Sequence, residues 1–175
     1  QMTSINILNK EKLPKVGFCG LAPTNISDAL FRLFKSKITV FRKRKFIDTS
    51  NLHSGSMIRW KTIKVLKAAN SIKSEIIIRT RSGGQTSSPE QQKIQYWENI
   101  LRCPYVLCTR GRGNFSARFY ETLSMGRIPL LVDTDKFLPF HDQINWKDHC
   151  VWVEEKNVDK ISSILLEFHE NISKK

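Results

Sequence analysis

Continuous apolar runs, rather than alternating apolar and polar residues, are the feature of this sequence that most restricts its fold. Clear examples lie at residues 16–21, 75–79 and 105–109. A run without alternation is typical of a strand buried on both faces, as in a parallel sheet covered by helices. Segments with helical periodicity separate most of these runs. The pattern therefore predicts an α/β fold with a doubly wound parallel sheet.

Strands and helices are expected to alternate along the whole chain. The expected strands are residues 16–21, 38–41, 75–79, 105–109, 128–132 and 150–153. The first expected helix starts near Ser27. The other expected helices are residues 57–69, 89–101, 116–125 and 157–172. In the first helix, Leu30, Leu33 and Phe34 share a face that we expect to pack on the core. The length of 175 residues predicts a single domain over residues 1–175.

The positive charge of the chain is concentrated in its first hundred residues. The net charge is +13, and residues 1–100 hold 18 Lys or Arg against 6 Asp or Glu, a net +12. Such a surface favours an anionic partner: nucleotide phosphates, a polyanionic acceptor, nucleic acid or an acidic membrane surface. The densest run, Arg42 to Lys45, is expected mainly to be a solvated strand end or loop.

The four cysteines, at positions 19, 103, 108 and 150, form no CxxC pair and no zinc-like spacing. Buried free thiols are expected, which favours a reducing compartment. No apolar run reaches membrane-spanning length. We therefore expect a cytoplasmic location, or the Golgi lumen if the chain is a truncated eukaryotic enzyme. A chain that begins with glutamine, as this one does, is compatible with a fragment or a processed product.

The most polar of the expected strand-to-helix turns runs from Thr109 to Ser116. In an open α/β sheet, ligands lie outside the carboxyl ends of the strands. Glycines let backbone amides approach a phosphate, a helix N-terminus attracts an anion, and arginine binds phosphate oxygens in pairs. A carboxylate one helical turn further on could bind ribose hydroxyls. The turn therefore predicts a phosphate and ribose site made by Arg110, Gly111, Gly113, Asn114, Ser116, Arg118 and Glu121.

Several local patterns near this turn have alternative interpretations. Ser116 stands where a dinucleotide fingerprint has its third glycine, so NAD binding is disfavoured. Arg118 and Glu121 could form a surface ion pair, because they are three residues apart on one helix. Asp133 and Thr134, at the end of the next strand, could contact sugar hydroxyls or serve only as turn residues.

The stretch from Tyr105 to Trp146 resembles the C-terminal part of the exostosin family of glycosyltransferases. The matching pieces are Arg110-Gly111-Arg112, Arg118-Phe119-x-Glu121, Gly126-Arg127-Ile128-Pro129, Leu138-Pro139-Phe140 and Ile144-Asn145-Trp146. Their order and spacing fit the family, and this combined match is more specific than any single motif. The similarity covers most of the chain, and it is strong over about a quarter of it.

The resemblance implies the donor-binding half of a GT-B enzyme, which consists of two Rossmann-like domains. It implies that Arg118 contacts the diphosphate of a nucleotide sugar, that Glu121 contacts the ribose, and that Arg110 lines the diphosphate pocket. It further implies a UDP-linked donor, a glycan acceptor, inversion, and no cofactor or essential metal. The family's N-terminal, acceptor-binding domain has no counterpart here. No catalytic base is therefore assigned, and His53 and His141 are only candidate imidazoles near loops.

Two alternatives to a UDP-sugar site stay open. The first is a non-catalytic basic module that binds a polyanion. Nucleic acid is not expected as that polyanion, because Phe31 and Phe34 are predicted to face the core rather than to stack on bases. The second alternative is a GDP- or ADP-linked donor, which the sequence does not distinguish from a UDP-linked one.

Overall fold

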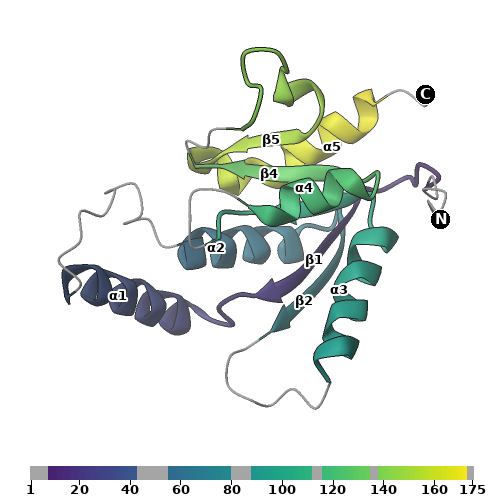
Figure 1. The fold of residues 1–175 in the computed structure, drawn as a ribbon. Coiled ribbons are helices and arrows are strands. Elements are labelled where there is room, and N and C mark those ends of the chain that lie inside the picture. Colours follow the sequence, from purple (N-terminus) through teal and green to yellow (C-terminus); the bar gives the residue numbers. More distant parts are fainter. Residues whose placement is uncertain (1–7, 43–54, 80–87, 112–115, 135–137, 173–175) are drawn as a thin grey trace.

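A computed structural model describes residues 8–42, 55–79, 88–111, 116–134 and 138–172, and it confirms the α/β, Rossmann-like fold (Figure 1). One five-stranded sheet has the order β2-β1-β3-β4-β5, and every pairing is parallel. The strands are β1 (Lys15–Leu21), β2 (Lys73–Arg79), β3 (Tyr105–Cys108), β4 (Ile128–Asp133) and β5 (Val151–Glu154).

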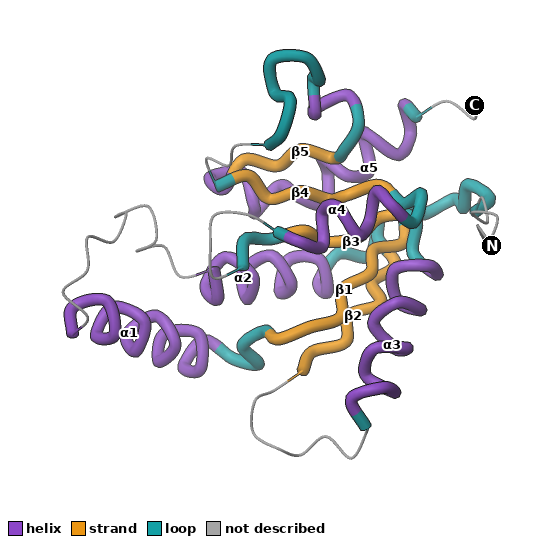
Figure 2. Tube along the Cα trace, viewed as in Figure 1, coloured by secondary structure: helices purple, strands orange, loops and turns teal. Residues whose placement is uncertain are grey.

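Helices cover both faces of this sheet (Figure 2). They are α1 (Ile26–Arg42), α2 (Gly55–Ala68), α3 (Pro89–Arg102), α4 (Ala117–Ser124) and α5 (Ile161–Asn171), with 3₁₀ turns η2 (Trp146–Asp148) and η3 (Glu155–Lys160). Neighbouring strand residues point to opposite faces: Leu107 packs with residues of α2 and α5, whereas Cys108 packs with Phe119 of α4. Two core clusters result, one on each side of the sheet.

Helix boundaries follow the local signals in the sequence. Ser88 caps α3 through a capping box with Gln91, and Pro89 occupies the first turn, as predicted. Gly126 ends α4 in the left-handed region, with φ 63°. All four cysteines are buried and free, as predicted. None of the helices within the described ranges is long and apolar enough to cross a membrane.

The strand predicted at residues 38–41 is wrong, because these residues belong to α1. The run Ile-Thr-Val-Phe has high strand propensity, but it follows a helix that is already nucleated. Asn25 starts that helix by accepting from the backbone N–H of Asp28 at 2.8 Å. No glycine or proline interrupts the chain before Gly55, so extending the helix costs less than starting a new strand.

The prediction that Leu30 and Phe34 face the core is also wrong. Their exposed fractions are 49% and 66%, and Phe31, also expected to face the core, is 64% exposed. Among the side chains of this helix that the structure describes, Ala29 is the buried one, and α1 packs mainly against α2. A small residue at the contact lets the two helices approach closely and leaves the larger apolar side chains outside.

The order of the strands locates the topological switch point of the sheet. From β1 the chain adds β2 on one side, and it then returns to add β3, β4 and β5 on the other side. The direction of winding thus reverses between β1 and β3. In doubly wound sheets this switch point separates the two outgoing connections and leaves space for a ligand at the carboxyl ends of the strands.

Candidate functional site

The turn singled out in the sequence leaves β3 at this switch point. Thr109 and Arg110 follow β3 directly and are each 3% exposed, while Gly111 is exposed. Ser116 precedes α4, and Arg118 and Glu121 lie one turn apart on that helix. The two other predicted donor-binding residues, Gly113 and Asn114, lie outside the described residues, as does His53. The fold therefore gathers the described part of the predicted set around the β3–α4 turn.

Arg118 reaches from α4 to the end of β1. Its Nη2 donates to the carbonyl oxygen of Cys19 at 2.7 Å. Its guanidinium carbon lies 4.5 Å from the ring centroid of Phe18 and 5.4 Å from that of Tyr96. Two aromatic faces hold the cation while part of it stays accessible to solvent. Arg118 of α4 is therefore fixed against the end of β1 at the switch point.

Glu121 is held by Tyr96 of α3, whose hydroxyl donates a short hydrogen bond to its Oε2. The sequence alone did not indicate this partner. Burial, opposed by the nearby Arg118, raises the pKa of Tyr96 to about 12, so the phenol stays a proton donor at neutral pH. None of the ion pairs between described residues joins Arg118 to Glu121. The surface ion pair considered as an alternative is therefore not formed.

Ser116 occupies the N-cap position of α4, but its side chain makes no capping hydrogen bond. Its backbone is extended, with φ −125° and ψ 110°, and the residue is buried. The first turn of α4 thus gets no cap from this hydroxyl. A helix N-terminus near two arginines is electrostatically suited to an anion.

Arg59 of α2 is a site residue that the sequence reasoning missed. Its Nη1 donates to Leu21 O at 2.6 Å, its Nη2 to Arg110 O at 2.7 Å, and its Nε to Thr109 Oγ1 at 3.1 Å. One guanidinium thus joins the end of β1 to the end of β3. Burial, with smaller contributions from Arg118 and Arg32, lowers the pKa of Arg59 to about 10, so it remains a cation at neutral pH. The acceptors of these three bonds are neutral oxygens.

The start of α2 lies against the backbone of the same turn. A Cβ atom on Gly55 would lie 3.0 Å from Arg110 O and 3.1 Å from Gly111 O. Both distances are too short for a comfortable contact, so α2 and the turn can meet this closely only through a glycine. Gly55 and Arg59 are four residues apart, so they lie on one side of the helix.

Replacing Gly55 with alanine is expected to cost about 1–3 kcal/mol of unfolding free energy, because the added methyl meets fixed backbone atoms. Urea denaturation followed by circular dichroism would measure the change. Lys67→Ala is a matched control, since it alters an exposed residue at the other end of α2. A stabilised Gly55→Ala variant would show that ordinary helix propensity outweighs the contact with the turn.

Replacing Tyr96 with phenylalanine is expected to cost about 1.5 kcal/mol, since it removes one hydrogen bond to a carboxylate and keeps the ring beside Arg118. Chemical denaturation of the variant measures this loss. Tyr120→Phe supplies the control, because Tyr120 is exposed on α4. Equal stabilities of the two variants would mean that the hydroxyl of Tyr96 does not hold Glu121 in solution.

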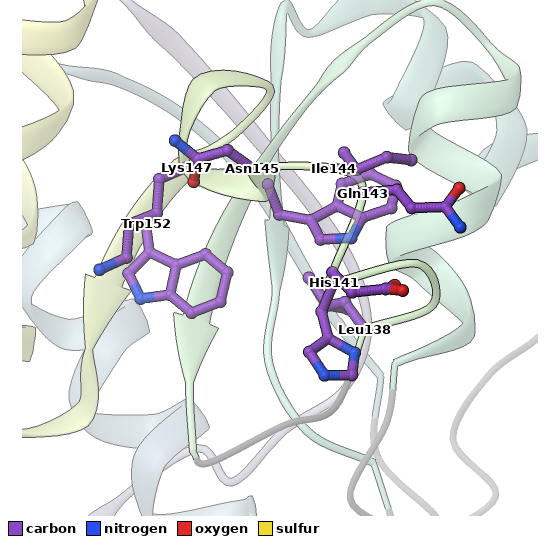
Figure 3. A pocket seen from close by; sticks show the side chains of 9 residues that line it. Leu138, His141, Gln143, Ile144, Asn145, Lys147 and Trp152 are labelled. Atoms are coloured by element: carbon purple, nitrogen blue, oxygen red, sulfur yellow. The ribbon is translucent and has the colours of Figure 1, made fainter.

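A separate hollow lies at the connection between β4 and β5 (Figure 3). Its volume is about 420 Å³, and its lining residues are Leu138, His141, Asp142, Gln143, Ile144, Asn145, Trp146, Lys147 and Trp152. Trp146 stabilises this connection by donating to Pro139 O at 2.8 Å and by packing edge-on against Phe119. The candidate imidazole His141 belongs to this hollow rather than to the β3–α4 turn.

Asp133 and Thr134 end β4, the strand next to β3, and Thr134 is buried. Their position at the carboxyl edge of the sheet agrees with either of the two roles considered for them. Among the residues that the structure describes, no three His, Cys, Asp or Glu side chains come together in a way that could hold a metal ion.

Comparison with known proteins matches most of the chain to one family model. Residues 22–168 match the exostosin GT47 domain. A 70-residue segment is 40% identical to a probable glucuronosyltransferase of Oryza sativa subsp. japonica and 39% identical to a probable β-1,4-xylosyltransferase of Arabidopsis thaliana. It covers 40% of this chain and 17% of each relative. A probable glucuronosyltransferase of Physcomitrium patens is 37% identical over 81 residues, which cover 46% of this chain and 18% of that protein.

Proposed function

The chain belongs to the exostosin GT47 family, and from this premise we propose that it is the donor-binding domain of a glycosyltransferase. The donor is a nucleotide sugar with a UDP leaving group, and the acceptor is a glycan. Relatives named as glucuronosyl- and xylosyltransferases support sugar transfer as the reaction class. The matched segments cover less than a fifth of the length of those relatives. The activity of the whole protein is therefore proposed here together with the role of this domain.

The observation that carries the proposal is the gathering of three arginines at the switch point of the sheet. Arg59 and Arg118 both bond to carbonyl oxygens of the final residues of β1, and Arg110 follows β3. Cations this close to one another repel, as the effect of Arg118 on the pKa of Arg59 indicates. A bound diphosphate would relieve that repulsion and would accept bonds from guanidinium groups.

In the proposed complex, Arg118 contacts the diphosphate and Glu121 accepts from the ribose hydroxyls. Arg110, Gly111, Gly113, Asn114 and Ser116 line the diphosphate pocket. Tyr96 keeps Glu121 in place for this contact, because its hydrogen bond uses only one of the two carboxylate oxygens. Arg59 joins the two strand ends beneath the pocket.

The proposed reaction is a single displacement at the anomeric carbon, with inversion. An acceptor hydroxyl oxygen forms a bond to that carbon while the bond to the β-phosphate oxygen breaks, and the electron pair leaves on UDP. A general base in an acceptor-binding domain outside this chain takes the hydroxyl proton. Arg118, Arg110 and the N-terminus of α4 stabilise the charge on the departing UDP, in the place of a metal ion.

Thermal unfolding in the presence of UDP, GDP, ADP, CMP and NAD tests the nucleotide assignment. A ligand at a hundred times its dissociation constant adds about 2.7 kcal/mol of stability. A rise in melting temperature with UDP, unchanged by EDTA, is expected. A rise with GDP or ADP instead would reassign the donor base, and loss of the UDP effect in EDTA would contradict metal independence.

A non-catalytic polyanion-binding module is the second candidate, and the charge of the chain favours it. The net charge of +13 would attract a heparin-like chain without any nucleotide pocket. Binding to heparin that falls steeply with salt, with no response to any nucleotide, would establish this function instead.

A further inference from the structure

Helix α1 exposes a set of large apolar side chains on one side. Its residues Ile26, Leu30, Phe31, Phe34 and Ile38 are between 43% and 66% exposed. Positions 26, 30, 34 and 38 repeat every four residues, and 31 lies beside them, so the set forms one continuous stripe. We call these five residues the α1 stripe. Scattered exposed apolar residues are ordinary, but five on one helix face indicate a surface that something covers.

Among the residues that the structure describes, the rest of the domain leaves this stripe exposed. Helix α1 extends from the carboxyl end of the sheet and lies beside the body of the molecule rather than over the sheet (Figure 1). It packs mainly against α2, and Ala29 is buried. The stripe is therefore free, in the described part of the chain, to meet another surface.

The charge of the helix indicates what kind of surface that is. The sequence of α1 contains four lysine or arginine residues and a single acidic residue, Asp28, which is paired with Arg32. The whole chain carries +13. A second copy of the chain would bring the same positive charge to the contact and would be repelled. An apolar partner surrounded by negative charge fits both features of the helix.

We propose that α1 lies in the surface of an acidic membrane, with the α1 stripe inserted among the lipids and the positive charge of the chain attracted to anionic headgroups. Amphipathic helices with aromatic and aliphatic residues on one face and lysine or arginine on the other bind membranes in this way. A helix of 17 residues is about 25 Å long, which suits a position in the plane of the membrane. The contact would hold the β1–α1 end of the domain against the lipid.

Sedimentation with lipid vesicles tests the contact. The chain is expected to bind phosphatidylcholine vesicles that contain about 30% phosphatidylserine, and to bind pure phosphatidylcholine much more weakly. Phe31→Ser combined with Phe34→Ser is expected to weaken this binding by about tenfold or more, because two inserted rings are lost. These two residues are exposed, so the melting temperature should not change.

A control variant removes two exposed apolar side chains elsewhere on the domain. Ile94, 51% exposed on α3, and Phe140, 62% exposed in the β4–β5 connection, are both replaced by serine. This variant is expected to bind vesicles as the unmodified chain does. Equal loss in both double variants, or no binding of the unmodified chain to acidic vesicles, would overturn the proposal.

A fluorescent label can distinguish insertion of the α1 stripe into the membrane from electrostatic attraction to its surface. Phe34→Cys and Phe140→Cys are labelled with a polarity-sensitive fluorophore, and the four native thiols are protected by burial. Acidic vesicles are expected to shift the emission of the label at 34 to the blue and to leave the label at 140 unchanged. The same blue shift without lipid, together with a dimer in solution, would mean that a second copy covers the stripe and would overturn the membrane contact. Neither measurement depends on nucleotide binding.

Discussion

Replacing Arg118 with alanine is expected to weaken UDP binding by about tenfold to a hundredfold. The side chain would otherwise supply charge-assisted hydrogen bonds worth about 1.5–3 kcal/mol to the diphosphate. Its position supports this role, since its bond to Cys19 O and its contacts with Phe18 and Tyr96 hold the cation at the switch point before any ligand arrives. Isothermal titration with UDP measures the change.

A comparison with uridine separates ligand contact from structural support. If Arg118 binds the diphosphate, the variant loses affinity for UDP and keeps its affinity for uridine. If Arg118 only supports the fold, both affinities fall together, which would contradict the assignment. Arg102→Ala is the control, because that arginine is exposed on α3 and pairs with Glu98. Glu121→Ala should show the converse result, with both ligands weakened, because each contains the ribose.

Replacing Arg59 with alanine is expected to destabilise the domain by about 3 kcal/mol or more. The change removes three hydrogen bonds of a partly buried cation and leaves Leu21 O, Thr109 Oγ1 and Arg110 O without that donor. The hydrogen bonds that join the end of β1 to the turn after β3 through Arg59 would then be lost. Urea denaturation gives the free energy, and the midpoint should fall at an unchanged slope.

Arg59→Lys distinguishes geometry from charge. A lysine keeps the positive charge, but a single ammonium cannot reach three acceptors in a planar fork, so it should restore little of the stability. Lys61→Ala is the control, since Lys61 lies on the same helix and forms an exposed ion pair with Asp159. A loss of less than about 1 kcal/mol in Arg59→Ala would show that the strand ends hold their positions without this residue.

The fold was predictable because its signals are local and mutually consistent. The buried runs of β1, β3 and β4 contain almost no polar residues, and Ser88-Pro89 and Gly126 mark helix ends. The one strand predicted wrongly, at residues 38–41, has strand-like composition inside a helix. Short apolar runs of this kind are ambiguous, and the decision depends on whether an adjacent helix can simply continue.

The candidate site was predictable only in part. The β3–α4 turn could be identified from its glycines and arginines, because they are adjacent in the sequence. Arg59 and Tyr96 gave no comparable signal, because each lies on another helix, 51 residues from Arg110 and 25 residues from Glu121 along the chain. Their surroundings in the sequence resemble those of ordinary surface residues.

The sequence by itself determined the class of fold, the parallel sheet, the turn that contains Arg110 with the helix that carries Arg118, and the family. These follow from periodicity, from turn chemistry and from motifs whose residues are near one another in the chain. Only the tertiary structure decided which groups surround that turn: that Arg59 ties two strand ends together, that Tyr96 rather than Arg118 binds Glu121, and that α1 turns its large apolar residues outward. The physical reason is that hydrogen bonds and burial depend on distance in space. Side chains far apart in the chain come close together only when the sheet and its helices have packed.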